Sequence, residues 1–500
     1  MYEEYRVTAD TVPAKVKITS QTDDYVPRYF IKRPQIDDAT EALMTQVRDR
    51  ILTEVEVSKE EFVDSSELEH VKERFRAKAN EIIEEVLPDI DPESQAILVG
   101  NLLHDMLGLG DLELLLHDEN LEEMVVNSAD EPVWAYHKEY GWLKTDLVME
   151  SEEQIQNYAS MIGRRVGKQI SNLNPLLDAH LTTGDRTNAT IKPISTQGNT
   201  ITIRKFARDP WTITDFIENK TINPEVAALL WICIQYEMNI IVSGGTGAGK
   251  TSMLGVLMPF IPSNNRIVSI EDTREIRLPE FLHWVPLTTR EPNPEGKGGV
   301  SMNDLLVNSL RMRPDRIIVG EIRREKQAEV LFEAMHTGHS VYSTLHAETA
   351  AQTIRRLVNP PINVPQTLVE AIDLNVVMFR DRRRNIRRAM QVSEVVTDYM
   401  GGDAEMEPNT LYKWHARDDE VKKKEESREV FDRLNLHAGL TKGEIKQSIQ
   451  DRKAILNWMV DHQINDVDQV GKVIAEFYQE EGAVIDRVKD DAEPDEVLDL

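Results

Sequence analysis

Cysteine is almost absent from this chain of 500 residues, since Cys233 is its only thiol. A single thiol forms neither an intrachain disulfide nor a four-thiolate zinc site, so we expect a reducing compartment. Long apolar runs are missing as well. No stretch of about 18 uncharged apolar residues occurs, and the N-terminus lacks the pattern of a secretory signal. These absences predict a cytoplasmic protein whose membrane association is peripheral.

Basic residues are in the minority. Lys and Arg number 58 against 87 Asp and Glu, which gives a formal net charge of −29. Nucleic acids and anionic lipids are also negative, so this charge disfavours broad binding to either.

One cluster of arginines departs from this acidic composition. It lies between two apolar segments, residues 375–379 and 389–396, and therefore predicts the tip of a β-hairpin. Its charges either prevent the pairing of a solvated sheet edge or form a docking patch for an acidic membrane partner. The members of this cluster are Arg380, Arg382, Arg383, Arg384, Arg387 and Arg388.

Composition and periodicity divide the chain into five segments. Residues 1–100 are expected to form an N-terminal extension, in which helical periodicity follows an irregular or weakly stranded lead-in. Residues 101–208 are typical of a small α/β domain, and residues 209–225 are expected to link it to the next one. Residues 226–400 alternate apolar strands with helices, which indicates a parallel sheet covered on both faces. Residues 401–500 are predicted to be a helical region with an acidic tail.

The strongest local signal is a glycine-rich loop between the apolar segment 239–242 and a helical pattern at 252–258. This is the strand–loop–helix setting of a phosphate-binding loop. Its backbone N–H groups surround phosphates at a helix N-terminus, its lysine neutralises the β- and γ-phosphates of ATP, and its threonine ligates Mg²⁺. The predicted nucleotide-binding residues are Gly244, Gly245, Thr246, Gly247, Ala248, Gly249, Lys250, Thr251 and Ser252.

Three other predicted strands end at or near Glu271, Glu321 and His346. Ligands of an open parallel sheet bind beyond the carboxyl ends of its strands, so we expect these side chains to meet near the nucleotide. Glu321 suits the metal, Glu271 suits activation of water, and His346 suits a hydrogen bond to the γ-phosphate. The structural alternative is that either carboxylate caps a following helix or pairs with Arg274 or Arg323.

Several segments resemble motifs of the type II/IV secretion ATPase superfamily, most closely those of the archaellum motor ATPase and of archaeal type IV pilus assembly ATPases. Besides the glycine-rich loop, residues 267–278 (IVSIEDTREIRL) resemble the aspartate box of that family. Residues 309–323 (SLRMRPDRIIVGEIR) resemble its atypical Walker B motif, and residues 336–346 (HTGHSVYSTLH) its histidine box. Residues 176–191 and 202–206 are similar to segments of its N-terminal domain. The tetracysteine zinc module of many bacterial members is absent, which favours the archaeal branch.

The resemblance implies an α/β fold, with a RecA-like P-loop NTPase domain on the C-terminal side, a smaller α/β N-terminal domain and helical extensions. It implies a homo-hexamer at the inner face of the cell membrane that hydrolyses ATP with Mg²⁺. This motor would assemble or rotate an archaeal filament through a polytopic membrane platform protein, without sequence-specific nucleic acid. Outside the loop, the resemblance gives catalytic roles to Glu271, Glu321, His339, His346 and Arg311, and nucleotide contacts to Arg186 and Arg204. Thr251 and Glu321 would hold the metal.

Three alternatives stay open at this point. An ATPase for adhesive pilus assembly or type II-like secretion uses the same engine with other partners. A nucleic-acid translocase of a conjugation-type system is disfavoured by the net charge of −29, although an arginine-lined pore would be compatible with it. A nonhydrolysing scaffold would bind ATP without turnover.

Overall fold

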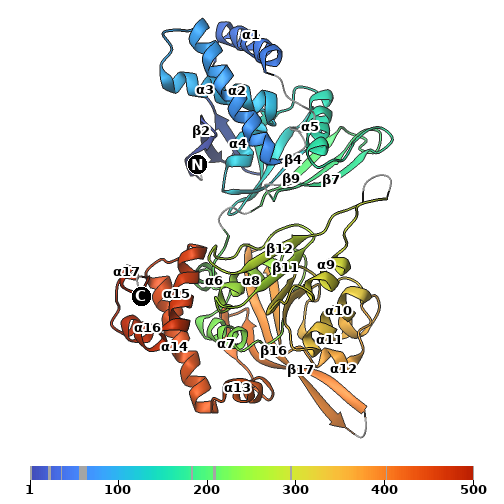
Figure 1. Cartoon of the computed structure of the whole chain (residues 1–500), viewed down its shortest axis with the longest axis vertical. Coiled ribbons are helices and arrows are strands. Elements are labelled where there is room, and N and C mark those ends of the chain that lie inside the picture. Colours follow the sequence, from blue (N-terminus) through green and yellow to red (C-terminus); the bar gives the residue numbers. More distant parts are fainter. Residues whose placement is uncertain are drawn as a thin grey trace. The chain divides into compact units, whose positions relative to one another are not determined.

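The computed structural model describes residues 3–20, 24–34, 36–55, 65–181, 184–206, 210–292, 296–400 and 403–498. The chain divides into two compact units, Met1–Arg208 and Asp209–Leu500. Each unit has its own sheet and its own apolar core (Figure 1). Within the described ranges, no helix has both the length and the hydropathy that a membrane span needs. The predicted mixed α/β fold with helical extensions is confirmed.

The first unit is built on a sheet in the order β1-β2-β3-β6-β5-β4-β9-β8-β7. Its strands pair antiparallel, except that β3 and β6 are parallel. The strands are β1 (Glu3–Ala9), β2 (Val12–Thr19), β3 (Arg28–Lys32), β4 (Leu121–Val126), β5 (Pro132–His137), β6 (Gly141–Val148), β7 (Leu176–His180), β8 (Arg186–Thr190) and β9 (Thr200–Arg204). The expected irregular lead-in therefore contains three strands, and in β2 residues Val12, Ala14, Val16 and Ile18 alternate into the core.

The helices of the first unit follow the periodicity read from the sequence. Pro88 follows α2, and Asp91 caps α3 by accepting the backbone N–H of Ser94. The core-facing side chains of α1, α2 and α3 form an apolar cluster of their own. The helices are α1 (Asp38–Glu54), α2 (Ser65–Val86), α3 (Pro92–Leu107), α4 (Leu112–His117) and α5 (Glu152–Arg165).

The second unit is built on a sheet in the order β12-β11-β13-β14-β10-β15-β16-β17-β18. The strands β12, β11, β13, β14, β10 and β15 are parallel to one another. The strands β16, β17 and β18 follow them as antiparallel hairpins. The strands are β10 (Ile240–Gly244), β11 (Ile267–Glu271), β12 (Trp284–Thr288), β13 (Arg316–Val319), β14 (Ser340–Leu345), β15 (Leu374–Asp381), β16 (Ile386–Met400), β17 (Asp403–His415) and β18 (Glu420–Lys423).

Helices cover both faces of this sheet, which explains why its central strands are continuously apolar. In β10, Ile240 and Val242 belong to one apolar cluster, while Ile241 between them belongs to the cluster on the opposite face. The helices are α6 (Ile213–Glu218), α7 (Pro224–Gln235), α8 (Lys250–Leu257), α9 (Met302–Ser309), α10 (Glu325–His336), α11 (Ala350–Val358), α12 (Gln366–Val369), α13 (Val430–Ala438), α14 (Lys442–Asp461), α15 (Val467–Gln479), α16 (Glu481–Lys489) and α17 (Pro494–Leu498), with a 3₁₀ turn, η1 (Met258–Phe260), after α8.

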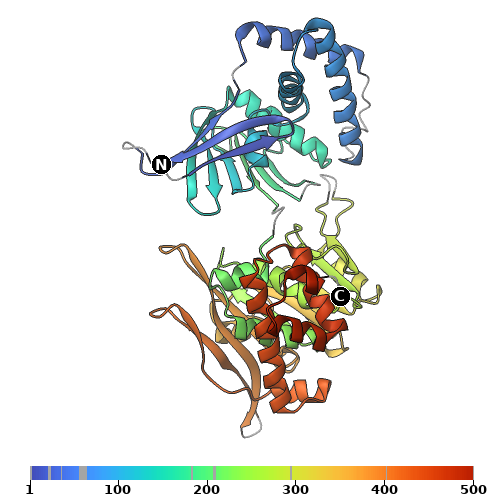
Figure 2. The same ribbon diagram turned by 90° about the vertical axis from the view of Figure 1, so that its left-hand side faces the viewer.

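The C-terminal helices pack together against α6, α7 and η1 of the second unit (Figure 2). The Arg452 guanidinium lies 5.5 Å from the ring of Trp231 in α7 and 4.6 Å from the ring of Phe477 in α15. Three details differ from the sequence expectations. Strands β17 and β18 lie in the segment expected to be helical, α6 lies in the expected linker, and Val497 of α17 is buried within the acidic tail.

Candidate nucleotide-binding site

The glycine-rich loop joins β10 to α8 at the carboxyl edge of the second sheet. Gly247 and Gly249 have φ angles of 70° and 85°, a region that residues with a Cβ rarely adopt. Gly249 is the N-cap of α8, and it has no side chain with which to cap the helix. The N–H groups of the first turn are therefore available to phosphate oxygens, which the partial positive charge of a helix N-terminus also attracts.

Three side chains from different elements meet at this loop. The Nζ of Lys250 lies 3.1 Å from the carbonyl oxygen of Gly245 and 3.3 Å from Nε2 of His346. The same His346 nitrogen lies 3.6 Å from Oε1 of Glu321. Burial lowers the pKa of Lys250, and burial together with the nearby ammonium lowers the pKa of His346. The ends of β13 and β14 thus bring a carboxylate and an imidazole to the loop lysine.

Arg323 connects this group to the end of β11. Its guanidinium donates to Oε2 of Glu321 at 2.9 Å through Nε and to Oδ2 of Asp272 at 2.7 Å through Nη1. The pairing of Glu321 with Arg323 is the structural alternative that the sequence left open. Because Oε1 of Glu321 faces His346, the carboxylate makes both contacts at once.

Glu271 is the last residue of β11 and is only 3% exposed. Its Oε1 accepts the backbone N–H groups of Glu275 at 3.0 Å and Ile276 at 3.2 Å. The carboxylate therefore orders the segment that follows the strand. This segment is not a helix, so the contact differs from the helix cap that the structural alternative predicted. Burial raises its pKa to about 7, a value that also suits a general base near neutral pH.

The three predicted arginines lie elsewhere on the chain. Arg186 and Arg204 belong to the first unit, where they are directly opposite each other on β8 and β9. Arg186 donates to Oδ2 of Asp178 at 2.9 Å on β7. Arg311 is exposed just after the end of α9. The nucleotide contacts that the resemblance assigns to Arg186 and Arg204, and the catalytic role that it assigns to Arg311, stay predictions.

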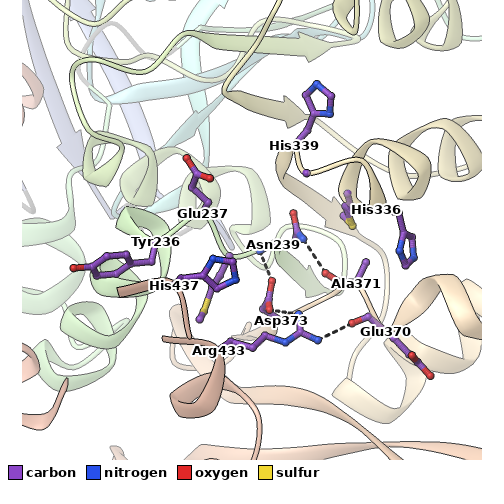
Figure 3. Close-up of a pocket in the computed structure, with 13 residues that line it drawn as sticks. Tyr236, Glu237, Asn239, His336, His339, Glu370, Ala371, Asp373, Arg433 and His437 are labelled. Carbon is purple, nitrogen blue, oxygen red and sulfur yellow. Dashed lines mark hydrogen bonds and ion pairs between the residues drawn. The ribbon is translucent and has the colours of Figure 1, made fainter. Parts of the chain in front are cut away.

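His339 lies at the start of β14, whereas His346 follows its end. This strand has six residues, so about 20 Å separates the two ends. His339 and His336 instead line a pocket of about 400 Å³ at the opposite edge of the sheet (Figure 3). The structure therefore does not bring His339 to the glycine-rich loop of its own chain.

Several residues that line this pocket form a hydrogen-bond network. The buried carboxylate of Asp373 accepts the backbone N–H of Asn239 at 2.7 Å and pairs with Arg433 (Figure 3). Arg433 also donates to the carbonyl oxygen of Glu370 at 3.1 Å. The side-chain amide of Asn239 donates to the carbonyl oxygen of Ala371 at 2.9 Å. These contacts tie the starts of β10 and β15 to α13.

The arginine cluster lies on the predicted hairpin between β15 and β16. The pairing of β15 with β10 ends at Met378, and that of β16 with β17 begins at Gln391, so the arginines lie beyond both neighbouring strands. Protection of a sheet edge and docking of a partner both stay predictions. Arg384 donates to Asp381 at 2.8 Å and lies 5.7 Å from the ring of Trp414. Arg388 is buried and donates to Asp419 at 2.7 Å.

Sequence reasoning missed a further member of the site. The Nε of Arg387 donates to the carbonyl oxygen of Gly247 at 3.2 Å, so this side chain touches the glycine-rich loop. The contact depends on the pairing of β15 with β10, which brings a distant hairpin beside the loop. The apolar segment 375–379 has the composition of one more parallel strand of the sheet. This pattern could have indicated that the hairpin lies beside the loop.

The chain is similar to several known proteins. Residues 115–397 match the family model described as type II/IV secretion system protein. The chain is 36% identical over 406 residues to an uncharacterized protein of Methanocaldococcus jannaschii, across 78% of this chain and 71% of that protein. It is 30% identical over 306 residues to the type IV secretion system protein PtlH of Bordetella pertussis, across 55% of this chain and 89% of that protein. The chain is also similar to the solved structure of the ATPase DotB of Legionella pneumophila, with 20% sequence identity. The match covers 72% of this chain and 92% of the DotB chain, with a TM-score of 0.41.

Proposed function

The chain belongs to the type II/IV secretion system protein family, and on that premise we propose that it is an ATP-hydrolysing motor. The observation that carries the proposal is the meeting of Lys250, His346 and Glu321 at a loop of left-handed glycines. An ammonium, a carboxylate and an imidazole beside a helix N-terminus are the groups that phosphoryl transfer from a nucleotide uses.

Each residue has a distinct task in this proposal. The Lys250 ammonium neutralises charge on the β- and γ-phosphates, and backbone N–H groups of the loop bind the remaining phosphate oxygens. The Glu271 carboxylate, whose orientation is fixed by two backbone N–H groups, accepts a proton from the attacking water. His346 lies between Lys250 and Glu321, and there its hydrogen bonding responds to the presence of the γ-phosphate.

The site also fits Mg²⁺. The Thr251 hydroxyl and the Glu321 carboxylate supply oxygen ligands, which this cation prefers. Among the residues that the structure describes, no group of three His, Cys, Asp or Glu side chains could hold a metal ion by itself. The remaining ligands are then oxygens of the nucleotide and water. When bound, the cation would neutralise charge on the phosphates.

We further propose that this motor is a homo-hexamer at the cytoplasmic face of the membrane. It would assemble or rotate an archaeal type IV pilus-like filament through a polytopic platform protein. Two observations support the archaeal branch: the likeness of the motifs to archaellum and archaeal pilus ATPases, and an archaeal relative aligned over 406 residues. A second candidate, a substrate-secreting type IV motor, is favoured by the similarity to PtlH over 306 residues.

The test uses the purified full-length protein and a strain that carries Lys250→Ala. We expect Mg²⁺-dependent ATP hydrolysis by the wild type, and a loss of about 100-fold or more in Lys250→Ala with an unchanged melting temperature. In cells, loss of surface filaments or of swimming would support the filament motor, whereas loss of secreted protein alone would support the second candidate. Hydrolysis by Lys250→Ala at the wild-type rate would refute the glycine-rich loop as the site of hydrolysis. Stimulation by DNA that declines with salt would instead indicate a nucleic-acid translocase.

A further inference from the structure

Arg380 and Arg387 lie against the glycine-rich loop of their own chain. Nε of Arg387 donates to the carbonyl oxygen of Gly247, 3.2 Å away. A Cβ placed on Gly247 would lie 2.7 Å from Nη1 of Arg380, and one placed on Gly249 would lie 3.3 Å from Cδ of Arg387. Both side chains are half-buried. The hairpin therefore covers the loop with two guanidinium groups, and bulkier residues at these glycines would displace them.

These two cations face each other across the hairpin. Arg380 and Arg387 are directly opposite in the antiparallel register of β15 and β16. Like charges in such a cross-strand pair are destabilising, and an anion bound beside them would offset the repulsion.

The sheet order indicates which part of a nucleotide these arginines meet. Strands β14 and β13 lie on one side of β10, and β15 and β16 lie on the other. Lys250 faces the first side, because it contacts His346 after β14, which in turn contacts Glu321 after β13. The γ-phosphate is expected there. The arginines border the loop on the second side, away from the γ-phosphate.

We propose that Arg380 and Arg387 bind the α-phosphate side of the nucleotide in the glycine-rich loop. This inference rests on the proposed nucleotide-binding function and adds a cationic contact from a strand outside the motifs. Arginine guanidinium groups present several N–H donors in a plane, and charge-assisted bonds to phosphate are among the strongest that side chains make. The Gly247 carbonyl oxygen accepts from Nε of Arg387 and so holds this guanidinium beside the site.

A contact with the α-phosphate is the same in ATP and ADP. It therefore contributes to binding in the ground state and in the transition state alike, which raises affinity without changing the chemical step. Removal of the charge should raise KM and leave kcat close to the wild-type value. Affinity for ATP and for ADP should fall by the same factor.

The experiment is an equilibrium titration of the full-length protein with fluorescent ADP and with a nonhydrolysable ATP analogue, both with Mg²⁺. Arg387→Gln keeps a side-chain N–H for the Gly247 carbonyl but removes the charge, and we expect about tenfold weaker binding of both nucleotides. The double variant that carries both Arg380→Gln and Arg387→Gln should bind more weakly still. Arg387→Lys keeps the positive charge and should recover most of the lost affinity. The matched control is Arg383→Gln, the same charge change at an exposed position of the same hairpin, which should stay within about twofold of wild type.

Several results would overturn the inference. Equal affinity of Arg387→Gln and wild type for both nucleotides would refute it, and so would a loss restricted to the ATP analogue, which would move the contact to the γ-phosphate. A fall in kcat at constant KM would also contradict it. Melting curves check that each variant is folded, and Arg380→Gln alone replaces Arg387→Gln if the latter unfolds. A wild-type protein that binds neither nucleotide would instead refute the proposed function itself.

Discussion

At the carboxyl edge of the second sheet, Lys250, Glu321 and His346 surround a loop whose backbone donors face outward from α8. At the opposite edge, His339 lines a pocket above Asp373 and Arg433. Both edges carry carboxylates, imidazoles and a cation. The carboxylate of Asp373 is occupied by donors of the protein itself, whereas the loop has helix N–H groups and an ammonium placed for an anion. The types of side chain present at an edge therefore do not by themselves distinguish a candidate ligand-binding site from a hydrogen-bond network that only stabilises the fold.

The direction of the strands explains the difference. In parallel α/β units each strand runs into the N-terminus of the next helix at the carboxyl edge, and helix N-termini attract anions. The opposite edge receives the ends of helices and the starts of strands, whose backbone groups need partners. Asn239 and Asp373 supply such partners at the starts of β10 and β15. The comparison leads to three predictions, in which effects on hydrolysis decrease from one to the next.

The largest effect is expected from Glu271→Gln. Glutamine can still accept the N–H groups of Glu275 and Ile276 but cannot take up a proton from water, so kcat should fall by about 100-fold or more while the Kd for ATP changes little. Because the pKa of Glu271 is raised to about 7, the wild-type kcat should rise with pH through that value as the carboxylate ionises. Steady-state rates between pH 5.5 and 8.5 test this. A flat profile would argue against Glu271 as the base.

The same substitution has a consequence for stability. The pKa of Glu271 in the folded state lies above its ordinary value of 4.5, so the folded state binds the proton more tightly than the unfolded state does. The part of the free-energy cost of burial that comes from ionisation is therefore absent below about pH 4.5, increases as the pH rises towards 7, and is constant above that. The melting temperature of Glu271→Gln relative to wild type should increase over this window and then level off.

The second prediction compares the two ends of β14. His346→Ala should reduce kcat by about tenfold, because it removes the imidazole between Lys250 and Glu321. His339→Ala should leave kcat within about twofold, since about 20 Å of strand separates it from the loop. Both variants are measured in the same ATPase assay. An equal loss in the two would break the comparison and indicate that His339 serves a site formed with another subunit.

Much of the candidate site could be predicted from the sequence, because its signals are local. The loop between β10 and α8 has its own glycine pattern, and the apolar runs before Glu271, Glu321 and His346 read as strands of a parallel sheet. The position of His339 was predictable too, since the six residues of β14 separate it from His346. The resemblance grouped the two histidines in one motif, whereas a strand places its ends at opposite edges of a sheet.

The remaining features depend on pairing between distant segments, which local patterns do not reveal. Arg387 reaches Gly247 only because β15 joins the sheet beside β10. The strand Asp403–His415 was missed because it has many charged residues and because its buried positions do not alternate, since the adjacent residues Leu411 and Tyr412 are both in the core. In the first unit, Arg6 and Thr8 alternate with the buried residues of β1, and Lys15 and Lys17 alternate with those of β2. This polar content hid both strands.

The third prediction concerns Arg433→Met, at the edge opposite the loop. Removal of the guanidinium leaves the Asp373 carboxylate, which is 6% exposed, without its cation. An unpaired buried charge costs about 3 kcal/mol, so the variant should melt at a lower temperature while its folded fraction keeps the wild-type kcat.

Burial already raises the pKa of Asp373, and loss of Arg433 should raise it further. The folded variant then holds a proton that the unfolded chain releases above pH 3.8, so its stability should decline as pH rises. Calorimetry at pH 5 and pH 8 measures this difference, and Arg383→Met serves as the exposed control. A fall in kcat larger than the loss of folded protein would show that the hydrogen-bond network around Asp373 contributes to turnover. The two edges of the sheet would then not differ in function as described.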